Sequence, residues 1–239
     1  MIDKRIRALV DELVADKGYV TGRRSFPRTV TDDDAVAITA SLHAALDDAT
    51  AVRAQTIKRR HLTLACSAGC ASCCDQLVMV YRPEVLRIAR WLDEPASAAI
   101  KAQFLEAYAA WQARVGDTPA RLKAALARGD YAAYDEAFFA HWRAHIACAF
   151  NQGGLCTIYD VRPLSCRDAH AVGTSAHCTG ESREQTPGMH SPDHDRWLEG
   201  ARAALRATHH AIGGAKEPPT ALCDAVAALL ASTPATSNV

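Results

Sequence analysis

The sequence predicts a mainly α-helical protein in which irregular, cysteine-rich loops are stapled to a helical body by a metal site. Three observations support this fold class. Alanine is abundant and aromatic residues make up only 6% of the 239 residues, a composition that favours helices over sheets. Apolar side chains recur at helical spacing over most of the chain. Eight of the nine cysteines fall between Cys66 and Cys178, in two segments with little periodicity.

The predicted helices begin at capping residues and end at glycine or proline. An amphipathic pattern starts at Ile2 and stops at Gly18, since glycine favours helix termination. Thr31 can cap a second helix, with three aspartates in its positive first turn, and this helix is predicted to reach about Ile57. A short β-like run is expected at 76–81. Further helices are predicted at about 83–92, 96–115, 118–129, 130–150, 191–212 and 219–231.

Charge and hydropathy exclude several classes of protein. Lys plus Arg and Asp plus Glu both number 27, so no net charge attracts the chain to nucleic acid or anionic lipid. Charged residues interrupt the N-terminal apolar positions, and no stretch approaches the ~18 apolar residues of a membrane helix. We therefore expect no membrane partner, no clear nucleic-acid binding and a cytoplasmic, reducing location. The short basic run at 58–61 is typical of a solvated helix end.

The cysteines form two groups with the spacing of metal ligands. The first group reads Cys66-x3-Cys70-x2-Cys73-Cys74, and the second reads Cys148-x7-Cys156-x9-Cys166-x11-Cys178. In a reducing compartment, clustered cysteines are more often metal ligands than disulfides. A zinc site or an iron–sulfur cubane needs four thiolates at one point. We therefore predict all eight as metal ligands and expect the two groups to converge, with metal binding ordering the glycine-rich second group.

A structural alternative is that these thiols are simply buried. If residues 66–74 were helical, their four cysteines would form one apolar stripe, and free cysteine is often a core residue. Gly69 and two neighbouring serines weaken a helix there. Enrichment in two separate segments also favours ligands. Cys223 lies among apolar residues of the last predicted helix and is interpreted as a core residue.

The expected cofactor is zinc or an iron–sulfur cluster, because thiolates select these over magnesium or calcium. Neighbouring side chains diverge, so Cys73 and Cys74 are poorly placed to share one mononuclear ion. A polynuclear cluster accepts diverging thiolates on separate iron atoms, whereas a zinc ion would leave several thiols idle. The sequence therefore favours an iron–sulfur cluster, with zinc as the alternative.

Two arginines beside the second group could support such a cofactor. Arg162 and Arg167 flank Cys166. Their guanidinium groups would offset the negative charge of a thiolate site and donate hydrogen bonds to its sulfurs. The alternative is that they pair with Asp160 and Asp168 on the surface.

Histidines offer a mixed set of ligands. His141, His145 and Cys148 would lie at i, i+4 and i+7 of the helix predicted over 130–150, which suits a His/Cys metal site. Such histidines more often form a solvated helix face. His170 and His177, near the second cysteine group, carry the same two interpretations.

These motifs resemble the CxxCxxCC cysteine-cluster family, whose members are described as zinc- or iron-chelating. The first group leads into Pro83-Glu84-Val85-Leu86, and the second contains Cys156-Thr157-Ile158-Tyr159-Asp160-Val161-Arg162-Pro163-Leu164-Ser165-Cys166-Arg167. This block follows the family pattern C-x-I-Y-x-x-R-P-x-x-C-R, and the likeness spans about residues 66–178. The chain departs from the family in its three-residue first spacer and in a helical insert at about 96–145, which leaves open which cysteines share a site.

The resemblance implies a metal- or cluster-binding protein with a structural, carrier or redox role. Flagellin lysine N-methylases carry a similar cysteine cluster, so an enzyme that uses the cluster for redox or group-transfer chemistry is one alternative, although no matching substrate site is visible. A helical interaction protein with buried free thiols is another. The expected organisation is an N-terminal helical extension (1–60), a cysteine-cluster domain (61–232) and a disordered tail (233–239).

Overall fold

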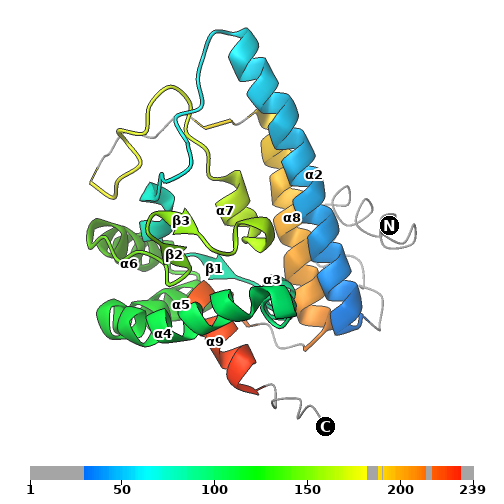
Figure 1. Cartoon of the computed structure of the whole chain (residues 1–239), viewed down its shortest axis with the longest axis vertical. Helices are drawn as coiled ribbons and strands as arrows, with labels where there is room; N and C mark the ends of the chain where they lie inside the picture. Colours follow the sequence, from blue (N-terminus) through cyan, green and yellow to red (C-terminus); the bar gives the residue numbers. More distant parts are fainter. Residues whose placement is uncertain (1–29, 182–187, 190, 214–216, 233–239) are drawn as a thin grey trace.

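The computed structural model describes residues 30–181, 188–189, 191–213 and 217–232, which are mainly helical (Figure 1). The predicted mainly α-helical class is confirmed, whereas the helix predicted near the N-terminus and the tail after 232 lie outside the described residues. The described α-helices are α2 (Asp32–Arg59), α3 (Arg82–Leu92), α4 (Ala98–Val115), α5 (Thr118–Arg128), α6 (Tyr131–Arg143), α7 (Leu164–Asp168), α8 (Pro192–Ala211) and α9 (Leu222–Ser232). Short 3-10 helices are η1 (Ser72–Asp75), η2 (Pro95–Ser97) and η3 (Tyr159–Val161).

Two hydrophobic clusters hold the helices together. The larger cluster joins α3, α4, α5, α6 and α9, and in it Phe104 stacks on Phe150 with ring centroids 4.0 Å apart. The smaller cluster joins α2, α7 and α8 through Leu42, Leu164 and Leu205. α3 contacts both α2 and α9 and so connects the clusters. Figure 1 shows α2 and α8 side by side along one edge, with α4, α5 and α6 gathered away from them.

Local sequence signals explain where several helices begin. Thr31, Asp130 and Ser191 each accept a hydrogen bond from a backbone N–H three residues further along. Each bond satisfies a donor that the first turn of a helix leaves unpaired. α2, α6 and α8 therefore start where the capping pattern predicts. The domain boundary expected at residue 60 stays a prediction, and α2 before it packs against α3, α7 and α8.

Short antiparallel pairs connect distant parts of the described chain. The strands are β1 (Met79–Val80), β2 (Asn151–Gln152), β3 (Leu155–Cys156) and β4 (Thr220–Ala221). The β1–β4 pair joins the start of α3 to the start of α9. β2 and β3 form a hairpin whose turn residues, Gly153 and Gly154, both have positive φ, as a type I′ turn requires. This hairpin presents Cys156 toward the first cysteine group.

The helix predicted up to residue 150 is wrong beyond Arg143, where α6 ends. His145 adopts a left-handed φ of 49°, a conformation that cannot continue a right-handed helix. Cys148 then donates its N–H to the carbonyl of Cys74 over 2.8 Å, rather than to a carbonyl four residues earlier. The helix face predicted to carry His141, His145 and Cys148 is therefore not formed.

Two smaller differences from the predicted elements involve the same strand pair. The β-like run expected at 76–81 is limited to β1, and the last helix begins at Leu222 rather than at 219. Residues 220–221 are taken up by pairing with β1, which delays the start of α9.

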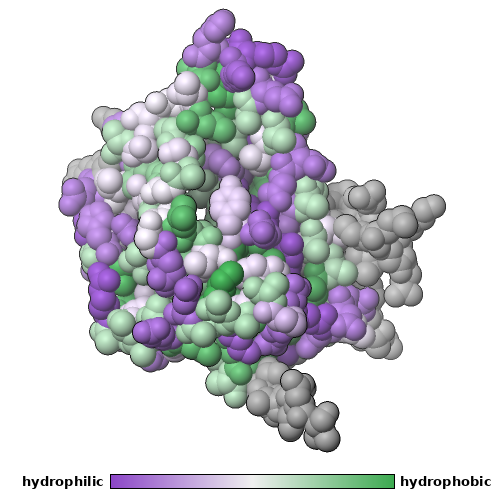
Figure 2. Space-filling view, viewed as in Figure 1, coloured by the Kyte–Doolittle hydropathy of each residue, from purple (hydrophilic) through white to green (hydrophobic). Residues whose placement is uncertain are grey.

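Two further findings concern the charge and the hydropathy of the described helices. Lys58, Arg59 and Arg60 are exposed where α2 ends, and Figure 2 shows hydrophilic colour gathered at that end of the molecule. The basic run is thus a solvated helix end. Within the described ranges, no helix combines the length and the apolar character needed to cross a bilayer.

Candidate cysteine site

Backbone hydrogen bonds join the two cysteine groups at their outer edge. The Ala65 N–H donates to the Ala171 carbonyl over 2.9 Å, and the Gly173 N–H donates to the Thr63 carbonyl over 2.8 Å. The Ala171 N–H donates in turn to the sulfur of Cys66 over 3.2 Å. Figure 1 shows the corresponding loops, one after α2 and one after α7, running next to each other. This edge holds Cys66 against the second group.

Two further contacts join the groups nearer their centre. The β2–β3 turn lies so close to the first group that a Cβ on Gly154 would be 3.2 Å from the Gly69 carbonyl oxygen. The Cys148 N–H bonds to the Cys74 carbonyl, as described above. The fold therefore brings the two predicted cysteine groups together, although they are far apart in the sequence.

The adjacent thiols of Cys73 and Cys74 form one hydrogen-bonded pair. The bond between them raises the pKa of Cys73 and lowers the pKa of Cys74. The nearby side-chain amide of Asn151 and the positive charge of Arg162 also lower the pKa of Cys74, while burial opposes them. Cys74 is therefore the thiol of this pair that more readily becomes a thiolate, the form that binds metals.

The thiols of the second group face the same region from β3 and α7. The pKa of Cys156 is raised to about 11, chiefly by burial and to a smaller extent by the neighbouring Cys148 and Cys74, while a hydrogen bond from the Ile158 backbone opposes the rise. Burial also raises the pKa of Cys166, with smaller contributions from Cys148, Cys156 and Cys74. Burial and neighbouring thiols thus both disfavour the thiolate form of Cys156 and Cys166. A cation there would reverse that preference by stabilising the thiolates.

Two predicted ligands lie in turns: Cys70 within the first group and Cys178 at the end of the second. The Cys70 N–H donates to the Ser67 carbonyl over 3.0 Å, and the Cys178 N–H donates to the Ser175 carbonyl over 2.9 Å. Both side chains are half-buried. Gly180 anchors the segment after Cys178 against the end of α6, where an added Cβ would lie 2.8 Å from a backbone nitrogen. The other six cysteines of the two groups are named the central cysteines: Cys66, which is exposed at the edge, and Cys73, Cys74, Cys148, Cys156 and Cys166.

The two arginines beside the second group have different surroundings. Arg162 places its guanidinium 3.8 Å from the centre of the Tyr159 ring, and its charge lowers the pKa of both Cys74 and Cys156. Its position suits the predicted role of offsetting thiolate charge. Tyr159 itself is 58% exposed, so Arg162 lies between the cysteines and the surface.

Arg167 instead braces the polypeptide around the cysteines. Its buried guanidinium donates to an Asp47 carboxylate oxygen over 2.5 Å and to the carbonyls of Arg162 and Asp160. The acidic partner comes from α2, so Arg167 holds α7 against that helix. Asp168, the other carboxylate considered for pairing, lies 2.7 Å from His194 Nε2.

Sequence reasoning missed the role of Glu84. This buried side chain accepts hydrogen bonds from the Leu164 N–H over 2.9 Å and from the Tyr81 N–H over 3.2 Å. It therefore fixes the start of α7, two residues before Cys166. Burial raises the pKa of Glu84 to about 7. The sequence signals a helix start at this glutamate, but nothing local reveals its contact with a residue 80 positions away.

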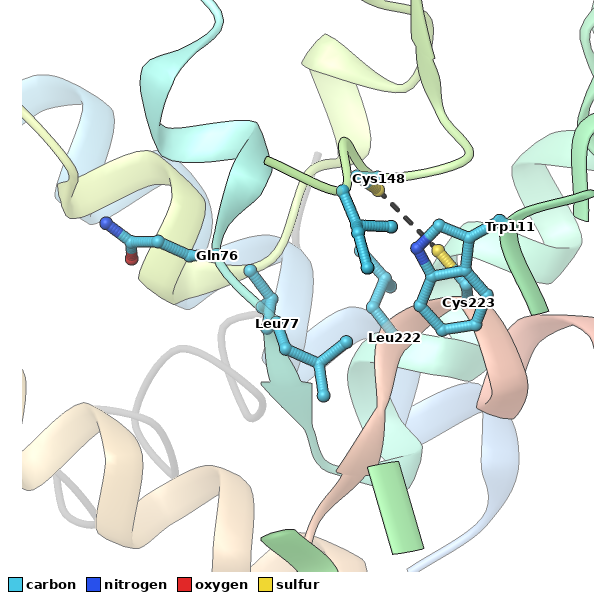
Figure 3. A pocket seen from close by; sticks show the side chains of 8 residues that line it. Gln76, Leu77, Trp111, Cys148, Leu222 and Cys223 are labelled. Carbon is cyan, nitrogen blue, oxygen red and sulfur yellow. Dashed lines mark hydrogen bonds between the residues drawn. The ribbon is translucent and has the colours of Figure 1, made fainter. Parts of the chain in front are cut away.

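Cys223 is a core residue, as predicted, but it also touches the candidate site. Its side chain is 3% exposed, and its sulfur lies 3.6 Å from that of Cys148 (Figure 3). No disulfide joins any of the nine cysteines. Over the ranges that the structure describes, no group of three or more His, Cys, Asp or Glu side chains is arranged to hold a metal ion. The sulfurs therefore gather in one region without sharing one coordination sphere.

Comparison with known proteins does not identify the chain. No known protein family, curated protein or solved structure matches it. The functional assignment therefore rests on the residues and their geometry.

Proposed function

We propose that this protein binds a metal ion or an iron–sulfur cluster through its clustered cysteines, with a structural, carrier or redox role. The observation that carries the proposal is a set of backbone hydrogen bonds between the two cysteine groups. Residues 63 and 65 pair with residues 173 and 171, and residue 74 pairs with residue 148. These bonds gather thiols from two distant segments into one region. The resemblance to the cysteine-cluster family supports the same conclusion.

The chemistry of the donors fits a thiophilic cofactor. The residues that would hold it are the central cysteines Cys66, Cys73, Cys74, Cys148, Cys156 and Cys166. Their side chains would have to rotate toward a common point. Burial keeps several of these thiols protonated, so binding would release protons and affinity would rise with pH. Arg162 would offset part of the negative charge of the ligated thiolates.

An iron–sulfur cluster suits this arrangement better than a single zinc ion. Cys73 and Cys74 are adjacent in the chain, and the side chains of adjacent residues diverge, so separate metal atoms would accommodate them more easily than one ion. More thiols lie in the region than the four that zinc needs. A bound cluster would supply one-electron redox chemistry, whereas zinc would supply structural stability.

Metal analysis of full-length protein purified without oxygen tests the proposal. We expect iron with acid-labile sulfide and a broad visible absorption that bleaches on reduction; stoichiometric zinc without sulfide would instead select the alternative cofactor. Cys166→Ser and Cys156→Ser should each lower the metal content. Cys223→Ser is the matched control, because it removes a neighbouring thiol that is not a predicted ligand. Protein that binds neither metal would overturn the proposal and favour a helical protein with buried free thiols.

A further inference from the structure

A second feature of the site is a close pair of thiols that includes the ninth cysteine. The sulfurs of Cys148 and Cys223 are 3.6 Å apart, although the residues are 75 positions apart in the sequence. Cys223 is the second residue of α9, whose start is fixed by the β1–β4 pair. Figure 3 shows the two thiols pointing toward each other.

We propose that Cys148 and Cys223 form a reversible disulfide when the protein meets a peroxide. A disulfide bond is about 2.05 Å long, so the sulfurs must approach by roughly 1.5 Å. Cys148 lies in the irregular segment after α6, where side-chain rotation and a small backbone shift can supply that approach. Cys73 and Cys74 are less suited to such a bond, because adjacent residues must close a strained ring to form one.

A small cavity borders the pair. Besides the two cysteines, it is lined by Gln76, Leu77, Val78, Trp111, Ile146 and Leu222. Its volume of about 10 Å³ accommodates roughly one molecule of the size of water. Cys148 is half-buried, whereas Cys223 is buried. A bulky oxidant does not fit this cavity, and a small oxidant reaches Cys148 before it reaches Cys223.

The chemistry proceeds in two balanced steps. The Cys148 thiolate attacks one oxygen of hydrogen peroxide, the O–O bond breaks, and Cys148 becomes a sulfenic acid as hydroxide leaves. The Cys223 thiol then attacks the Cys148 sulfur; an S–S bond forms, the S–O bond breaks and water leaves. The two sulfurs lose two electrons and the peroxide gains them. Cys148 takes the first step because it is the more accessible of the two thiols.

The disulfide would also regulate the candidate site, a consequence that rests on the proposed function. Once bonded to Cys223, Cys148 can no longer donate a thiolate to a metal. The bond would also tie α9 to the segment that follows α6. Oxidation would therefore weaken metal binding, and reduction by a thiol would restore it.

Peptide mapping of the full-length protein tests the disulfide. Reduced protein, both as purified without oxygen and after chelation, is treated with stoichiometric hydrogen peroxide, alkylated and digested. We expect a peptide pair joined through Cys148 and Cys223 to appear before other disulfides, to be lost on reduction, and to be absent from Cys223→Ser and Cys223→Ala. The alanine variant is included because a buried serine hydroxyl can destabilise the core, and far-UV circular dichroism verifies that both variants fold. Oxidation that joins other cysteines first, or none, would overturn the inference.

Metal content measured in the same samples separates the two proposals. We expect peroxide to release metal from the wild type as the disulfide forms, and more slowly from Cys223→Ser. A Cys148–Cys223 disulfide in protein that binds no metal would refute the proposed function and leave the disulfide established. Metal binding without this disulfide would refute the inference alone.

Discussion

Glu84 should make the stability of this protein depend on pH in a way that one substitution can reveal. Its side chain is buried, and its pKa is raised from 4.5 to about 7 in the folded protein because burial disfavours the charged carboxylate. The folded state therefore holds the proton more tightly than the unfolded state does. The contribution of Glu84 to stability is fully present below pH 4.5 and is lost as the pH rises to about 7.

The magnitude follows from the size of the pKa change. Each pKa unit corresponds to about 1.4 kcal/mol, so the loss across this window should be about 3 kcal/mol. Buried His43 acts in the opposite direction, since burial and the charge of Arg87 lower its pKa well below 6.5. Protonation of His43 in the unfolded state therefore removes stability as the pH falls below 6.5. The wild-type profile contains both effects, and only a comparison isolates Glu84.

The assay is urea unfolding of the wild type and Glu84→Gln at pH values from 5 to 8. Glutamine cannot ionise, so the stability of the wild type relative to the variant should fall by about 3 kcal/mol between pH 5 and pH 8. The absolute stability of the variant is not decisive, because the glutamine amide faces one of the two N–H groups that the carboxylate accepts from and costs about 1 kcal/mol or more. Parallel pH profiles for the two proteins would refute this account of Glu84.

Three further outcomes are expected. Gly154→Ala should lower the free energy of unfolding by about 2 kcal/mol, and Gly153→Ala should lower it by about 1 kcal/mol. Both positions have positive φ, but only a Cβ at 154 meets the Gly69 carbonyl oxygen. Equal losses for the two variants in urea unfolding would contradict this. Arg167→Met should lower the free energy of unfolding by about 3 kcal/mol, because two carbonyls and a carboxylate lose their donor. Arg167→Lys should recover only part of that loss. A lysine variant as stable as the wild type would argue against the bracing role. Chelation of metal-loaded protein should expose residues 144–181 to protease, while helices such as α4, α5 and α6 persist and keep the helical circular dichroism signal. An unchanged cleavage pattern would speak against a metal that orders this segment.

The sequence predicts the helices well where the signal is local. Thr31, Asp130 and Ser191 cap helices at the expected positions, because a cap depends on residues within one turn. The end of α6 could not be predicted in this way. The helical pattern continues past Arg143, and the bond that takes the Cys148 N–H out of a helix comes from the first cysteine group.

In the candidate site, too, the contacts between residues far apart in the sequence could not be predicted individually. Spacing alone predicted that two cysteine groups would meet, and their backbones do. The partners of Arg167 and Cys223 were not predictable, since Asp47 is 120 positions from Arg167 and Cys148 is 75 positions from Cys223. One sequence carries no pattern that links such pairs, and metal binding itself stays a prediction.

The distance along the chain between the two halves of the site also sets an order of events during synthesis. Residues 63–74 leave the ribosome long before residues 148–173, and α3, α4, α5 and α6 are made between them. Helices form from neighbouring residues within microseconds, whereas pairing across a long loop is slow. At a synthesis rate of about 5–20 residues per second, several seconds pass between the synthesis of the first cysteine group and that of the second. During that interval its thiols are exposed to cellular oxidants, and the proposed cofactor could bind the complete site only after residues 148–173 have been made.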